Sequence, residues 1–330
     1  MTEYTLFLDE STSDDKNFIC VGGFAIKNNS IDKLRSKIND IRKLIWDDEY
    51  IAKHDPILHS TELNLIHSHR NDGFLSSYIK REEYNIFTTK NAEEIHKIYL
   101  SIYHELCMIL KSFDITIFSC IINNDNYKYI YDGKFTDDYY HICLETIIEN
   151  YIYFLNDKKG VGSIIYEARN SINRNDSFSP DEKMFNNFCA IKSQNKGIIN
   201  STPKSTLIRL RNFEYQRKSG QNLCLGLADF IIYNISKMQH IEDKNRNEFM
   251  HKIYNNAYNG NYTDDKNLRD YFGIRVLPED IRLVSNLKEQ NEHMRKKIKN
   301  QKNEINKLNR INNDLKNKFD KNEKEIDKSL

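Results

Sequence analysis

The chain carries acidic residues at the ends of apolar segments, and one inside such a segment, where carboxylates could do metal chemistry. Asp9 and Glu10 follow the first apolar, β-prone run, and Glu167 follows a later one. Asp229 lies within the apolar stretch Leu225–Ile232, where an ionised side chain is costly unless it is paired or bound to a cation. The positions of these acids therefore predict that their carboxylates have a partner inside the fold.

Carboxylates that converge on one point would form a site for a divalent cation. Their oxygens are hard ligands, which Mg²⁺ and Mn²⁺ prefer, and clustered like charges would repel one another without a cation between them. Two such ions about 3.5–4 Å apart can activate water and stabilise the leaving oxygen of a phosphodiester. One hypothesis is therefore a shared Mg²⁺ or Mn²⁺ site that includes Asp9, Glu167 and Asp229.

Each of these acids also has a purely structural interpretation. Asp9 could begin a turn, with its side chain bonded to backbone amides. The other acids could form ion pairs, for which the candidate partners are Arg169 for Glu167, and Lys237 or Arg211 for Asp229. Spacing along the chain leaves both interpretations open.

A further constellation is His59-Ser60-Thr61-Glu62. Ser60 or Thr61 could cap a helix that Glu62 enters, and the i, i+3 spacing would bring His59 and Glu62 together. In a functional interpretation Glu62 is a metal carboxylate, and His59 binds phosphate or moves a proton. A capped helix start with no chemistry is the alternative.

The elements that must position these residues include both predicted strands and predicted helices. Strands are predicted at Tyr4–Leu8, Phe18–Ile26, Ile115–Ile122, Gly162–Tyr166 and Thr206–Leu210. Helices are predicted at Ile31–Ile45, Ala92–Lys111, Tyr139–Leu155 and Asn222–Met238. An antiparallel start followed by alternating helices and strands predicts an α/β fold with a mixed sheet flanked by helices. The sequence contains no glycine-rich dinucleotide or phosphate loop.

The composition of the chain changes near Pro278, because glycine and proline do not occur after this point. This change divides the chain into residues 1–278 and 279–330. The second segment has a seven-residue repeat, and nine of its thirteen seam positions are apolar. The seam positions are Val284, Leu287, Asn291, Met294, Ile298, Gln301, Ile305, Leu308, Asn312, Leu315, Phe319, Asn322 and Ile326. This period predicts a coiled-coil helix that makes the protein a homodimer, with a single solvated helix as the alternative.

The formal charge of +1 is an average over two unlike parts. The tail from Ile281 holds 14 Lys or Arg and 8 Asp or Glu, a net of +6, which leaves the body with −5. One basic stretch of the body, interleaved with Phe213 and Tyr215, leads to the Asp229 segment and suits contact with nucleic acid. Its basic residues are Arg209, Arg211, Arg217 and Lys218. A strand with solvated charges is the alternative.

Composition excludes several classes of protein. With 39% hydrophobic residues and 12% aromatic residues, the chain is not disordered by composition. The six cysteines include no Cys-x-x-Cys pair, which is typical of reduced thiols in a cytoplasmic protein and argues against a zinc site. No apolar run reaches the roughly 20 residues of a membrane span, and the first residues lack the pattern of a signal peptide.

The order of four short motifs resembles the domain-of-unknown-function 3800 family, over roughly residues 4 to 240. The motifs are Asp9-Glu10-Ser11, Val21-Gly22-Gly23, the His-Ser-x-Glu segment from His59 to Glu62, and Leu227-Ala228-Asp229. Two positions depart from the family pattern, namely Thr12 in place of glycine and Gly226 in place of glutamine. Neither departure removes a candidate ligand.

The resemblance implies an RNase H-like fold and a nuclease that hydrolyses phosphodiester bonds of DNA or RNA. It implies that Asp9, Glu62, Glu167 and Asp229 are the metal-binding acids, while Glu10 and His59 match the motifs without a defined role. It also suggests a bacterial antiphage or mobile-element setting. The competing hypothesis is a non-catalytic interaction module for nucleic acid or protein, built on the same scaffold and dimerised by the coiled coil.

Overall fold

The fold is that of a computed structural model, which describes most of the first 277 residues and a short part of the tail. The described ranges are 1–12, 17–124, 139–168, 209–219, 222–239, 245–259, 273–277 and 301–309, with scattered single residues and pairs of residues between and beyond them. The chain divides into two compact units, Met1–Pro278 and Glu279–Leu330. Arg169 and most of the heptad seam lie outside the described residues.

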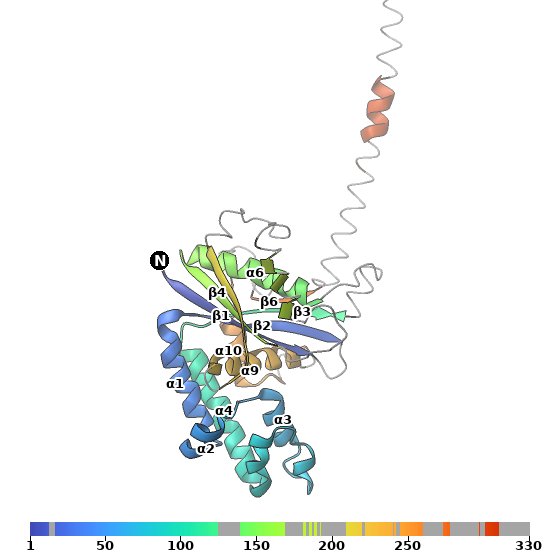
Figure 1. The fold of residues 1–330 in the computed structure, drawn as a ribbon. Helices are drawn as coiled ribbons and strands as arrows, with labels where there is room; N and C mark the ends of the chain where they lie inside the picture. Colours follow the sequence, from blue (N-terminus) through green and yellow to red (C-terminus); the bar gives the residue numbers. More distant parts are fainter. Residues whose placement is uncertain are drawn as a thin grey trace, which may run out of the picture. The chain divides into compact units, whose positions relative to one another are not determined.

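A six-stranded mixed sheet forms the centre of the first unit (Figure 1). Its strands are β1 (Glu3–Thr12), β2 (Phe18–Lys27), β3 (Thr116–Asn123), β4 (Val161–Glu167), β5 (Leu210–Gln216) and β6 (Ile274–Leu277). They lie in the order β5-β4-β1-β2-β3-β6. The pairs β1–β2 and β2–β3 are antiparallel, whereas β1–β4, β4–β5 and β3–β6 are parallel. This arrangement confirms the predicted mixed sheet.

The glycine pair of β2 allows the three central strands to approach one another closely. A Cβ atom on Gly22 would lie 2.5 Å from the carbonyl oxygen of Phe118 in β3. A Cβ atom on Gly23 would clash with the carbonyl oxygen of Phe7 in β1. Because Gly22 pairs with Asp9 across the hairpin, this close packing surrounds the first candidate acid.

Helices cover both faces of the sheet. Helix α6 (Tyr139–Asp157) packs on one face, where its apolar residues meet Leu6 and Leu8 of β1. The opposite face carries α9 (Leu223–Met238), which packs on β1 and β2, together with α1 (Ile31–Arg42), α4 (Ala92–Ser112) and α10 (Glu248–Asn255). Figure 1 shows α6 on one side of the sheet and α9, α10, α1 and α4 on the other.

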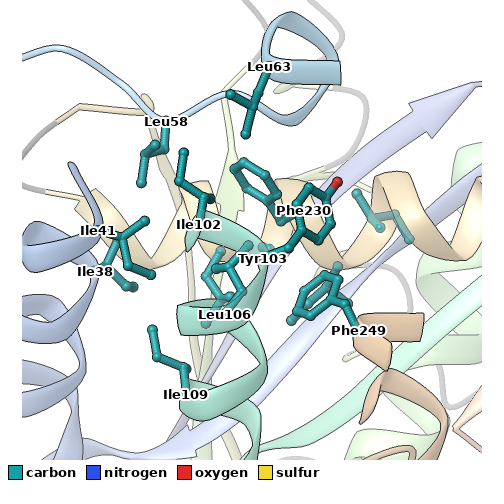
Figure 2. Packing of buried hydrophobic residues seen from close by; sticks show 14 of the residues in the cluster. Ile38, Ile41, Leu58, Leu63, Ile102, Tyr103, Leu106, Ile109, Phe230 and Phe249 are labelled. Carbon is teal, nitrogen blue, oxygen red and sulfur yellow. The ribbon is translucent and has the colours of Figure 1, made fainter. Parts of the chain in front are cut away.

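The larger core lies between α9 and the helices outside it. Figure 2 shows Ile102 and Leu106 of α4 facing Ile38 of α1, with Tyr103 turned toward Phe230 and Phe249. The ring of Tyr103 meets those two rings edge to face, at centroid distances of 6.0 and 5.5 Å. Such contacts add to the burial of these side chains and hold α9 against the outer helices.

The remaining described elements are short and connect α1 to α4. They are α2 (Asp48–His54), α3 (Ser60–Ser68) and the 3₁₀ segments Leu75–Ser77 and Glu82–Thr89, and a third 3₁₀ turn, Asn28–Ser30, precedes α1. Helix α3 begins at Ser60 with His59 as its N-cap, so the prediction that Ser60 or Thr61 caps this helix is wrong. The prediction of a strand ending at Leu210 is also wrong, because β5 begins there and continues to Gln216.

In the described part of the tail, residues 301–309 are helical and exposed. Three of the predicted seam residues lie here, namely Gln301, Ile305 and Leu308, and the two apolar ones, Ile305 and Leu308, are 56% and 60% exposed. No helix among the described residues has the length and apolar character needed to cross a membrane. All six cysteines are free thiols.

Candidate active site

Two of the candidate acids meet because β1 and β4 are neighbouring parallel strands. Leu8 of β1 lies beside Tyr166 of β4, so the next residues, Asp9 and Glu167, lie side by side toward the C-terminal ends of the two strands. Side chains alternate between the two faces along a strand. Asp9 therefore shares the α9 face with Phe7, and it is 2% exposed.

The third acid comes from the helix that covers this face. Asp229 lies in the middle of α9, whose residues are almost all buried. Its Oδ2 accepts a hydrogen bond of 2.6 Å from the backbone N–H of Ser60, the first residue of α3. The unpaired N–H groups and the dipole at a helix N-terminus favour a carboxylate at this place.

Lys218 lies at the point where the three carboxylates converge. Its Nζ is 2.8 Å from Asp9 Oδ2, 2.8 Å from Glu167 Oε2 and 3.0 Å from Asp229 Oδ1. The side chain of Lys218 is only 7% exposed. Since Gln216 pairs with Glu167, Lys218 reaches the cluster two residues after β5 ends, on the segment that leads to α9.

The charges of this cluster do not cancel. Three carboxylates and one ammonium group leave a net charge of −2 when all are ionised. Burial raises the pKa of Asp9 well above its usual range, and Glu167 and Asp229 add to this effect while Lys218 opposes it. Burial also acts to raise the pKa of Asp229, but Lys218, His59 and Ser60 outweigh it and hold that pKa well below its usual range.

The donor set has the chemistry of a divalent-cation site, although its spacing is that of an ammonium site. Among the described residues, no group of three or more His, Cys, Asp or Glu side chains is spaced to hold a metal ion. The oxygens around Lys218 lie 2.8–3.0 Å from its nitrogen, whereas Mg²⁺–oxygen distances are about 2.0–2.1 Å. Three hard oxygen donors that already surround one cation fit Mg²⁺ or Mn²⁺ once they move inward and Lys218 leaves.

His59 lies beside the cluster, on the chain that enters α3. Its backbone N–H donates a hydrogen bond of 2.7 Å to the hydroxyl of Tyr84, which in turn donates to the carbonyl of Ile57. Its Nδ1 is buried and has no hydrogen-bond partner among the described residues. Burial lowers the pKa of His59, while the nearby carboxylate of Asp229 acts to raise it. An imidazole that is neutral near pH 7 therefore faces the acids.

Glu62 does not share the ion pair with Lys218 that joins the other three acids. Its side chain is directed to another segment, where Oε1 accepts hydrogen bonds from the backbone N–H groups of Lys80 and Arg81. Glu62 is 3% exposed, and among the described residues no ion pair joins it to Lys218. In this arrangement the carboxylate holds the segment that carries Arg81, which is near enough to His59 to act on its pKa.

Glu10 lies on the other face of the sheet. It follows Asp9 directly, so the alternation of a strand turns it toward the α6 side. There its Oε2 accepts a hydrogen bond of 3.1 Å from the hydroxyl of Tyr166. The backbone N–H of Glu10, by contrast, donates to Asp9 Oδ1 at 2.7 Å. Glu10 therefore touches the cluster through its backbone.

The predicted basic stretch is divided between the two ends of β5. Arg209 donates hydrogen bonds to Asn156 and to the carbonyl of Gly160, and Arg211 forms an ion pair with Glu3 at 2.6 Å. These contacts lie at the start of the strand, roughly 20 Å from its other end at a rise of about 3.3 Å per residue. The other two basic residues follow the strand's end, where Arg217 is exposed and Lys218 is buried among the acids.

The role of Lys218 is the feature of the site that the sequence pattern did not indicate. As one of four basic residues near Phe213 and Tyr215, it was expected to contact nucleic acid. The available signal was its position between a strand that neighbours Glu167 and the helix that carries Asp229. Comparisons with protein-family models, with curated proteins and with solved structures found no match to this chain.

Proposed function

We propose that the protein is a divalent-metal-dependent nuclease with an RNase H-like fold, whose site is formed by Asp9, Glu167 and Asp229. The observation that carries this proposal is the convergence of three carboxylates, from β1, β4 and α9, on a single cationic group. Three carboxylates this close together repel one another unless a cation lies between them, and hard oxygen donors favour Mg²⁺ or Mn²⁺.

The sheet supports the fold assignment. Its first three strands form an antiparallel meander in the order β3-β2-β1, and β4 and β5 continue from β1 in parallel. A mixed sheet flanked by helices is the architecture that the family resemblance implies. The acids lie on two neighbouring parallel strands, Asp9 on β1 and Glu167 on β4, and on α9, the helix that covers them. The motif order noted in the sequence agrees with the same assignment.

Mg²⁺ or Mn²⁺ bound by the three acids would supply activation of water and stabilisation of charge on the phosphodiester. The chain's own groups provide the surroundings. Backbone N–H groups donate hydrogen bonds to Asp9 Oδ1 and Asp229 Oδ2, and these bonds orient the two carboxylates with their other oxygens toward the site. The partnerless Nδ1 of His59 can accept a proton beside the site. Arg217 is exposed next to the cluster, where it can contact a phosphate group.

The tail supports a dimeric form of this enzyme. Ile305 and Leu308 are exposed on the described helical segment, and a second copy of the same helix would cover them. The excess of basic residues in the tail would add nonspecific attraction for nucleic acid. A bacterial antiphage or mobile-element role remains the setting that the family resemblance suggests, and the genes beside this one would test it.

Cleavage assays on panels of DNA and RNA test the proposal. We expect the wild type to cleave at least one panel with Mn²⁺ or Mg²⁺, and Asp229→Asn to lose roughly 10²-fold or more of that activity, because several kcal/mol of charge stabilisation depend on the site. Glu3→Gln, which removes a carboxylate at the far end of β1, is the matched control and should retain activity. Equal activity of the wild type and Asp229→Asn would refute the proposal.

One observation favours a second function. Lys218 already satisfies the three carboxylates, as it would in an ion cluster that only joins β1, β4, β5 and α9. In that case the protein would be a non-catalytic module that binds nucleic acid or protein. Binding that is independent of metal and unchanged in Asp229→Asn, with no cleavage of any substrate, would favour this second function.

A further inference from the structure

The most unusual group in the described part of the protein is the ammonium of Lys218. A buried lysine is found only where partners compensate for its lost hydration. Here the three partners come from three different elements, and each lies within 3.0 Å of the same nitrogen. The ammonium therefore lies at the centre of the carboxylate set and is not paired with one acid at its edge.

That central position is also where a metal ion would bind. A cation held by Asp9, Glu167 and Asp229 together must lie near the point that is equally close to their inner oxygens, and Lys218 Nζ is at that point. Two cations cannot occupy it at once. The charge of the set also favours an exchange, since one ammonium leaves a net −2 and a divalent ion in its place would leave −1.

We propose that Lys218 is a positioning residue that competes with the divalent cation for one place between the three acids. The inference depends on the metal site of the proposed function. In the metal-free protein the ammonium gathers the three carboxylates and keeps them from repelling one another. When the ion binds, the ammonium leaves that place. Lys218 lies on a connecting segment after β5, and such a segment can move more readily than a strand or helix.

The same geometry gives opposite expectations for stability and for metal affinity. Without Lys218, the buried carboxylates of Asp9 and Asp229 and the partly exposed carboxylate of Glu167 face one another with no cation, so the metal-free protein should be less stable. The metal, however, no longer has to displace a positive charge, so it should bind more tightly. A lysine that only stabilised the fold, or that helped to hold the ion, would have no such pair of effects.

The test measures Mn²⁺ binding by electron paramagnetic resonance of the free ion, together with the thermal unfolding temperature in EDTA and in excess Mn²⁺. Lys218→Met should bind Mn²⁺ at least about tenfold more tightly than the wild type, because removal of a unit charge at this distance changes the interaction by more than 1.4 kcal/mol. It should also unfold at a lower temperature in EDTA and recover in Mn²⁺. Lys218→Arg, which keeps the charge, should retain the wild-type affinity.

Lys27→Met is the matched control, because it removes a lysine of the same charge from an ion pair at the opposite end of the sheet. Its Mn²⁺ affinity should equal that of the wild type. If Lys218→Met does not unfold cooperatively, Lys218→Gln takes its place, since the amide still donates a hydrogen bond to the acids.

Unchanged or weaker Mn²⁺ binding by Lys218→Met, or by Lys218→Gln in its place, would overturn the inference, as would absence of Mn²⁺ binding by the wild type and every variant. The cleavage assay separates this failure from failure of the proposed function. A tenfold gain in Mn²⁺ affinity in Lys218→Met, with no cleavage of DNA or RNA by the wild type, would support the inference and refute the nuclease proposal. Metal-dependent cleavage by the wild type, with no gain in affinity in Lys218→Met, removes the inference alone.

Discussion

Glu62 is the residue for which the sequence motif and the structure predict different results, and its replacement by glutamine distinguishes them. If Glu62 is a metal ligand, removal of its charge should lower the affinity of the protein for the ion. If Glu62 only accepts hydrogen bonds from the backbone N–H groups of Lys80 and Arg81, the same change should lower the stability of the fold and leave metal binding unchanged. Glu62→Gln keeps the size of the side chain and an oxygen that can accept both hydrogen bonds.

The size of the effect follows from those two hydrogen bonds. A hydrogen bond to a charged group contributes about 1.5–3 kcal/mol and one to a neutral group about 0.5–1.5 kcal/mol. The two hydrogen bonds are partly buried, Lys80 is exposed and Arg81 is half-buried, so the lower part of each range applies. Glu62→Gln should therefore cost roughly 1–2 kcal/mol. Glu62→Ala, which leaves both donors without an acceptor, should cost about 2–4 kcal/mol.

Thermal unfolding and Mn²⁺ titration of the same samples provide the assay. A cost of 1 kcal/mol lowers the midpoint of a domain of this size by about 2–4 °C. We expect Glu62→Gln to unfold roughly 2–8 °C below the wild type and to bind Mn²⁺ with the same affinity within about threefold. Asp229→Asn is the control for loss of a ligand. A loss of Mn²⁺ affinity in Glu62→Gln as large as that in Asp229→Asn would refute this reasoning.

Two further predictions concern other parts of the molecule. Burial lowers the pKa of His67 to about 4, and the positive charges of Arg70 and His96 contribute to this shift. The unfolded chain therefore takes up this proton at a higher pH than the folded protein does. As a result, the free energy of unfolding falls as the pH drops from about 6.5 to 4. In His67→Phe, which keeps the ring stacked on Tyr99, chemical unfolding between pH 4 and 7.5 should show a shallower dependence; an unchanged slope contradicts the assignment. Leu308→Asp places a charge in the proposed seam and should convert a dimer to a monomer in light scattering; a monomeric wild type would exclude the coiled coil.

Local sequence was sufficient to predict the main elements of the fold. The helix at Ala92–Ser112 begins with a capping box of Asn91 and Glu94, and its apolar residues repeat with the period of a helix. The hairpin of β1 and β2 was indicated by two β-prone runs and a polar connection. In these cases the deciding interactions are within one element or between neighbours in sequence, so the pattern carries the information.

The boundaries that failed depend on contacts distant in sequence. The strand at Leu210–Gln216 carries exposed polar residues such as Arg211 and Glu214, and its pairing with β4 selects it as a strand. His59 has no side-chain hydrogen bond at the N-cap of α3, and the hydroxyl of Tyr84 and the carboxylate of Asp229 fix the chain there instead. A single sequence contains no direct signal for such partners.

The sequence by itself determined which residues must find a partner. Asp229 lies within an apolar helix, and Asp9 and Glu167 directly follow apolar, β-prone runs of the sequence. Such carboxylates cannot stay ionised and unpaired when these elements are buried. Only the tertiary structure decided which partners they find. The parallel register of β1 and β4 places Asp9 beside Glu167, and the alternation of the strand removes Glu10 from the set. The same packing brings Lys218 to the centre, because electrostatic pairing depends on distance in space, and 209 residues of chain separate Lys218 from Asp9.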